Sequence, residues 1–166
     1  AVSAIDSPWP SCMSLPDSTI TSPPIWRAPT SKLIRVRVEG FSNTDVGAIV
    51  LKGTTREPRL GNPAHRVYET PMGMLNAIGL QNPGVDQVVD RILPTLDFTE
   101  TRFFANVCGS TIDDYVEVTR RFDDSAIDAI EINISCPNIK EGGIQFGCSL
   151  TGTYDVVSAV RKVTTL

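Results

Sequence analysis

The sequence has little of several features that mark particular classes of protein. No apolar run approaches the roughly 20 residues needed to cross a bilayer. The N-terminus has no basic start followed by an apolar stretch, so no secretory signal is expected. Lys and Arg residues do not cluster, and the net charge is −4, which argues against nucleic acid as a partner. The composition of the 166 residues is that of one globular domain. We expect the protein in the cytoplasm and not associated with a membrane.

The four cysteines, Cys12, Cys108, Cys136 and Cys148, form no CxxC pair and no zinc-type spacing. No metal site is therefore expected on this chain, and no iron–sulfur cluster of the ferredoxin kind. In a secreted protein four cysteines can form two disulfides. Without an export signal, free thiols in a reducing compartment are the favoured interpretation.

The composition changes near residue 32. Residues 1–31 hold half of the twelve prolines and show neither helical nor strand periodicity, which predicts an extended, poorly packed segment. Residues 32–38 alternate apolar and basic side chains, as in a short strand exposed on one face. We therefore predict a division into a lead segment, residues 1–40, and a folded part, residues 41–166.

In the folded part, apolar runs of strand length alternate with stretches of helical periodicity. Strands are predicted at residues 47–51, 103–107 and 129–134. Three helices are predicted. The first covers residues 85–96 and the last lies near 153–163. The second runs to about Phe122 and begins at a Ser110 N-cap, with Asp113 in its first turn. This alternation is typical of βαβ units and a parallel sheet, so the fold class is α/β.

The chemically distinctive residues follow the predicted strands. Lys52 ends the first, Asn106 the second, and Asn133 and Cys136 the third. Strand ends of a parallel α/β fold share one face, which is where such folds place their sites. The first connection, residues 53–84, is far longer than an ordinary βα loop, which predicts a lid or a binding loop.

Six motifs, collinear from about Val46 to Val163, carry a resemblance to the class 1B dihydroorotate dehydrogenase catalytic subunits. They are Lys52-Gly-Thr-Thr55, Gly61-Asn-Pro63, Glu69-Thr-Pro71, Met74-Leu-Asn-Ala-Ile-Gly-Leu-Gln-Asn-Pro-Gly84, Asn106-Val-Cys-Gly-Ser110 and Asn133-Ile-Ser-Cys-Pro-Asn-Ile-Lys-Glu-Gly-Gly143.

The resemblance implies a (β/α)8 TIM barrel, of which this chain would form roughly the first half. It also implies an FMN cofactor and the oxidation of (S)-dihydroorotate to orotate in de novo pyrimidine (UMP) biosynthesis. NAD+ would be the final electron acceptor, reached through a partner subunit that carries FAD and an iron–sulfur cluster.

The same resemblance assigns roles to individual residues. Cys136 corresponds to the base that removes the C5 proton of dihydroorotate. The residues implied in substrate binding are Lys52, Asn76, Ala77, Ile78, Gly79, Leu80, Asn133 and Asn138. The residues implied in flavin binding are Lys52, Gly53, Asn106 and Asn133.

Two departures from the family pattern qualify this interpretation. Residues 1–40 contain no counterpart of the family's Ala-Ser-Gly turn beside the flavin, and a complete barrel needs roughly 250 residues. We therefore expect this chain alone to bind FMN weakly or not at all. The main alternative is a non-catalytic, truncated half-barrel that at most self-associates into a homo-oligomer. A related flavin enzyme acting on free pyrimidine bases fits less well, because the sequence continues as Asn-Ile-Lys-Glu-Gly-Gly after Cys136-Pro137.

Overall fold

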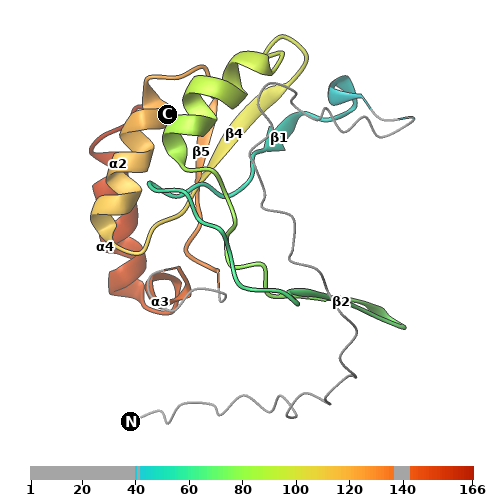
Figure 1. Ribbon diagram of the computed structural model, residues 1–166. Coiled ribbons are helices and arrows are strands. Elements are labelled where there is room, and N and C mark those ends of the chain that lie inside the picture. The colour runs from blue at the N-terminus through green and yellow to red at the C-terminus, as the bar shows by residue number, and fades with distance from the viewer. Residues whose placement is uncertain (1–39, 41, 137–142) are drawn as a thin grey trace. The chain divides into compact units, whose positions relative to one another are not determined.

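A three-stranded parallel sheet forms the centre of the fold (Figure 1). The computed structural model describes residues 40, 42–136 and 143–166, which lie in one unit of the chain, residues 33–166. The strands are β1 (Ala48–Val50), β4 (Arg102–Val107) and β5 (Ala129–Ile132), in the order β1-β4-β5. The three strands predicted from residue 47 onward are confirmed. The lead segment, the strand predicted at 32–38 and Asn138 lie outside the described residues.

The pairing between β1 and β4 continues past the end of β1 with an irregularity. Leu51 N–H donates to the Phe104 carbonyl at 2.8 Å, and Thr54 N–H donates to the Asn106 carbonyl at 2.9 Å. Between these two hydrogen bonds, the segment after β1 moves on by three residues while β4 moves on by two. The one extra residue makes a β-bulge at Lys52 and Gly53. Bulges bend a strand and redirect its side chains, and they are common next to active sites.

Two long helices, α2 (Ile112–Asp123) and α4 (Leu150–Arg161), pack over one face of the sheet (Figure 1). Their apolar side chains meet those of alternate residues of β4, because successive side chains of a strand point to opposite faces. The fully enclosed part of this core comprises Ala105, Val107, Tyr115, Val118, Phe122 and Val156, each at 0% exposure. Among the described residues, no helix is both long and apolar enough to span a bilayer.

Helix α2 begins one residue later than the sequence analysis predicted. Thr111 is the N-cap, and Asp114 completes the capping box by accepting from the Thr111 N–H at 3.0 Å. Ser110 and Asp113 have the same spacing as Thr111 and Asp114, so the pattern alone selects the wrong pair. The Asp114 carboxylate also accepts from the Ser110 N–H, at 3.0 Å, which places Ser110 outside the helix.

The helix predicted at residues 85–96 is present, but its winding changes along its length. α1 (Val85–Gln87) continues as the π-helical segment η2 (Val88–Ile92) and then as the 3-10 turn η3 (Leu93–Thr95). Pro94 has no N–H to donate to the preceding turn, so a regular α-helical ladder cannot run through this position.

The long connection between β1 and α1 contains a hairpin that the sequence analysis missed. It consists of β2 (Val67–Thr70) and β3 (Gly73–Asn76), paired antiparallel. Most of its side chains are exposed on both faces, so they lack the alternation of apolar and polar residues that predicts a half-buried strand. Two short elements, η1 (Asn43–Asp45) and α3 (Ile144–Gly147), were also not predicted.

Candidate active site

Two asparagines at the ends of neighbouring strands contact each other directly. Asn106 lies near the end of β4, and Asn133 follows β5 and extends its pairing through a 2.9 Å bond from its N–H to the Val107 carbonyl. The Asn133 side-chain Nδ2 donates to Asn106 Oδ1 at 3.1 Å. Asn106 is only 7% exposed, so its amide orientation is fixed by protein groups rather than by water. The structure thus brings together two residues that the sequence placed at one strand-end face.

Gly53, in the bulge after β1, lies against the same asparagine. A Cβ atom at this position would stand 2.9 Å from Asn106 Oδ1, 3.0 Å from Cys108 Sγ and 3.5 Å from Leu80 Cδ2. Gly53 therefore marks a place where backbone approaches the strand ends more closely than a side chain would allow.

Cys136 lies on a segment that is held from both sides. The Tyr115 hydroxyl, on α2, donates to the Asn133 carbonyl at 2.8 Å, and the Ile144 N–H donates to the Cys136 carbonyl at 3.2 Å. In α3, a Cβ on Gly147 would stand 2.3 Å from the Ile134 carbonyl oxygen, so the helix also approaches closely. The Cys136 side chain is half-buried. Burial raises the pKa of Tyr115 to about 12, so its hydroxyl remains a donor at neutral pH.

The two cysteines near the strand ends differ in character. Burial, and then the nearby Cys136, raise the pKa of the Cys108 thiol to about 12, against the opposing effect of Lys52. Cys108 is 1% exposed and remains a neutral thiol at physiological pH. Its thiol donates to Asn106 Oδ1 at 3.4 Å. Cys136, in contrast, is only half-buried.

Lys52 is exposed and precedes Gly53 in the bulge. Its ammonium is close enough to act electrostatically on the Cys108 thiol, which places positive charge at the strand ends. A cation here would favour an anionic ligand or charge that develops on one.

The predicted substrate loop, Asn76–Leu80, is in contact with the strand ends at one end only. Leu80 is 8% exposed and packs next to Gly53. Gly79 and Leu80 both take positive φ angles, +77° and 54°. Such a conformation is unfavourable for leucine and therefore requires support from its surroundings. Asn76 and Ala77 are exposed on the hairpin.

Two asparagines that the sequence analysis did not select hold this loop. Asn62 donates from Nδ2 to the Ala77 carbonyl at 2.7 Å and from its backbone N–H to the Ile78 carbonyl at 2.9 Å. Asn82, 6% exposed, donates from Nδ2 to the Leu80 carbonyl at 2.8 Å and accepts from the Thr55 N–H at 3.1 Å. Both precede a proline, and Asn-Pro is a turn signal that could have identified them.

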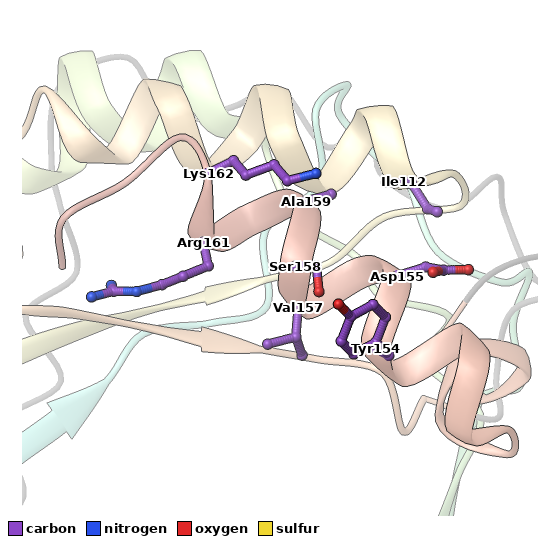
Figure 2. Close-up of a pocket in the computed structure, with 8 residues that line it drawn as sticks. All are labelled: Ile112, Tyr154, Asp155, Val157, Ser158, Ala159, Arg161 and Lys162. Atoms are coloured by element: carbon purple, nitrogen blue, oxygen red, sulfur yellow. The ribbon is translucent and has the colours of Figure 1, made fainter.

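Neither of the two principal cavities contains the predicted site residues. The larger, about 660 Å³, lies along α4 and reaches the first residue of α2. Figure 2 shows it lined by Ile112, Tyr154, Asp155, Val157, Ser158, Ala159, Arg161 and Lys162. The smaller, about 160 Å³, lies between the segment after β1 and the start of α2, beside Thr55 and Ser110. In the described part of the chain, no group of three or more His, Cys, Asp or Glu side chains is placed to hold a metal ion.

Replacing Gly53 by alanine is expected to lower the free energy of unfolding by about 1–3 kcal/mol, since the new methyl would press on two buried, hydrogen-bonded side chains. Urea denaturation measures this change. Gly47→Ala is the matched control, because a Cβ there meets nothing within 4 Å. Equal effects of the two substitutions would show that Gly53 is not a point of close approach.

The parallel sheet, its helical cover and the polar residues gathered at the strand ends define an α/β protein, and the sequential order of its strands is consistent with part of a barrel. The chain belongs to the dihydroorotate dehydrogenase family, whose model matches residues 31–166. The family resemblance and the TIM-barrel fold class predicted from the sequence are thereby confirmed.

Curated relatives agree with this assignment. A protein of Listeria monocytogenes serotype 4a (strain HCC23), named dihydroorotate dehydrogenase B (NAD(+)), catalytic subunit, is 54% identical over 127 residues, which cover 76% of this chain and 42% of the relative. Proteins of the same name from Phocaeicola vulgatus and Geobacillus kaustophilus are 52% and 50% identical over 119 residues, or 71% of this chain and 39% and 38% of theirs. The chain thus spans about two fifths of the length of these relatives.

Proposed function

We propose that this chain is part of an FMN-dependent dihydroorotate dehydrogenase that oxidises (S)-dihydroorotate to orotate in pyrimidine biosynthesis. The observation that carries the proposal is the contact between Asn106 and Asn133 beside the bare backbone of Gly53, on the strand-end face that also bears Cys136. Amide groups supply both donors and acceptors, which suits the polar edges of a flavin and of a pyrimidine.

The residues present fit a flavin in three respects. Gly53 lets the backbone after β1 pack closely against Asn106 and Cys108, which brings the ends of the strands together. Asn106 and Asn133 offer amide groups of fixed orientation, and Lys52 offers a cation. FMN, when bound, supplies the acceptor for the hydride that leaves C6 of dihydroorotate.

The chain's own residues would perform the rest of the chemistry. The Cys136 sulfur removes the proton from C5 of dihydroorotate, so that a C–H bond breaks at each of C5 and C6 and orotate forms. Lys52 stabilises the substrate carboxylate, and the loop Asn76–Leu80 together with Asn133 and Asn138 contacts the pyrimidine ring. A cytoplasmic location belongs to this proposal, because a thiol base must stay reduced.

The names of the relatives support a proposal about the electron acceptor and the partner. Those proteins are catalytic subunits of an NAD+-linked enzyme. We propose that this chain likewise passes electrons to NAD+ through a second subunit that carries FAD and an iron–sulfur cluster.

A second candidate function is a non-catalytic half-barrel that associates with itself. It is favoured by the exposure of apolar side chains on both sides of the fold: Val50 of β1 is 47% exposed and Tyr154 of α4 is 69% exposed. Apolar surface of this kind promotes association.

One experiment separates the two candidates. The protein is incubated with FMN, freed of unbound flavin and examined by visible absorption, and dihydroorotate is then added without oxygen. Retained flavin that bleaches supports the enzyme. Retained flavin that does not bleach argues against the substrate but not against the cofactor. A colourless protein that elutes as a dimer supports the second candidate.

A further inference from the structure

Glu131 occupies an unusual position in the sheet. It lies in β5 between Ile130 and Ile132, which both pack against the core under the helices. Because side chains alternate along a strand, Glu131 points to the opposite face, where it is exposed. The register pairs it with Asn106 of β4. A carboxylate thus stands on the open face of the sheet, beside the buried asparagine of the candidate site.

A continuous series of hydrogen bonds begins at this carboxylate. Asn106 donates from Nδ2 to Glu131 Oε1, and Asn133 donates from Nδ2 to Asn106 Oδ1 at 3.1 Å. Asn133 Oδ1 in turn accepts from the Ser135 N–H at 3.3 Å and from the Ser135 hydroxyl at 3.4 Å. Every donor points toward Glu131, and the series ends next to Cys136.

The direction of this series is determined by chemistry. An ionised carboxylate can only accept, so Asn106 must turn its NH2 group toward Glu131. Its Oδ1 then faces the Asn133 NH2 group and the Cys108 thiol, which are both donors. The opposite orientation of the Asn106 amide would place oxygen against carboxylate on one side and NH2 against NH2 on the other. A charged acceptor also strengthens the bond that it receives.

We propose that Glu131 is a positioning residue: its carboxylate fixes the amide orientations of Asn106 and Asn133 and so determines which donor and acceptor groups face the ligand. What the amides recognise rests on the proposed function, but their orientation does not. Glu131 itself takes no part in proton or hydride transfer.

The test combines two measurements on the full chain, with and without a Glu131→Gln substitution. Side-chain NH2 signals of Asn106 and Asn133 are followed by 15N NMR without flavin, and FMN affinity is measured by fluorescence titration. Glutamine has nearly the shape of glutamate but can present either a donor or an acceptor. Glu117→Gln is the matched control, because Glu117 lies on α2 and binds Arg120 at 2.6 Å, away from the strand ends.

In Glu131→Gln we expect the NH2 signals of both asparagines to move, and FMN affinity to fall roughly 10- to 100-fold, as for the loss of one charge-assisted hydrogen bond. The control should change neither. Unchanged NH2 signals in a folded variant would overturn the proposal, and so would a shift confined to Asn106. If both signals move but neither protein binds FMN, the positioning role is supported and flavin binding by this chain alone is excluded.

Discussion

With both proteins held at saturating FMN, a Cys136→Ala variant is expected to reduce the flavin with dihydroorotate about 10²- to 10⁴-fold more slowly than the unmodified protein, the usual contribution of a positioned general base. Alanine removes the sulfur that we propose as the acceptor of the C5 proton. It leaves intact the backbone bonds that hold this segment, from Ile144 N–H to the Cys136 carbonyl and from Tyr115 to Asn133. The Cys136→Ala protein should therefore retain nearly as much flavin as the unmodified protein, while the rate at which dihydroorotate bleaches the flavin falls strongly. Anaerobic stopped-flow absorption of the flavin-loaded protein measures both.

The matched control is Cys148→Ala, because Cys148 is also a free thiol but lies exposed after α3. It should bleach at the unmodified rate. Equal rates for the Cys136 and Cys148 variants would remove Cys136 from proton transfer. Loss of flavin from the Cys136 variant would point instead to a structural role for this side chain.

Phe122→Ala is expected to lower the free energy of unfolding by about 3–5 kcal/mol, the range for large-to-small substitutions of buried aromatic residues. Phe122 is fully buried at the last turn of α2, in the core between this helix and the sheet. A domain of this size is stable by only about 5–15 kcal/mol, so the variant would lose a large fraction of its stability. Chemical denaturation followed by circular dichroism measures the effect.

Leu60→Ala serves as the comparison, since Leu60 is 88% exposed. Its free energy of unfolding should stay within about 0.5 kcal/mol of the unmodified protein, as for most surface substitutions. A similar small change for Phe122→Ala would mean that α2 does not pack on the sheet as described.

The regular elements of the fold were predictable because burial imposes a period on the sequence. The strands at 47–51, 103–107 and 129–134 and the helix ending near Phe122 follow from apolar side chains that repeat at the spacing of a covered face. The hairpin β2–β3 was missed because its side chains are exposed and show no such period. The cap of α2 was misplaced by one residue because two overlapping pairs satisfy the same spacing rule, and only backbone geometry distinguishes Thr111 from Ser110.

The candidate site was predictable in outline, since the carboxyl ends of parallel strands must share one face. The structure does bring Gly53, Asn106 and Asn133 together there. Asn82 and Glu131 escaped notice because their importance depends on partners 27 and 25 residues away in sequence, Thr55 and Asn106. No local pattern encodes such contacts. The catalytic and binding roles assigned to individual residues stay predictions.

Tyr115 belongs to two parts of the molecule at once. Its ring is part of the hydrophobic core, edge-on to Phe146 at 5.8 Å, while its hydroxyl supports the chain at Asn133. This position of α2 therefore has two physical requirements, a side chain that fills the interior and an oxygen that reaches the end of the neighbouring strand. Phenylalanine would satisfy the first requirement alone, because it would keep the packing but lose the hydrogen bond that holds the chain at Asn133.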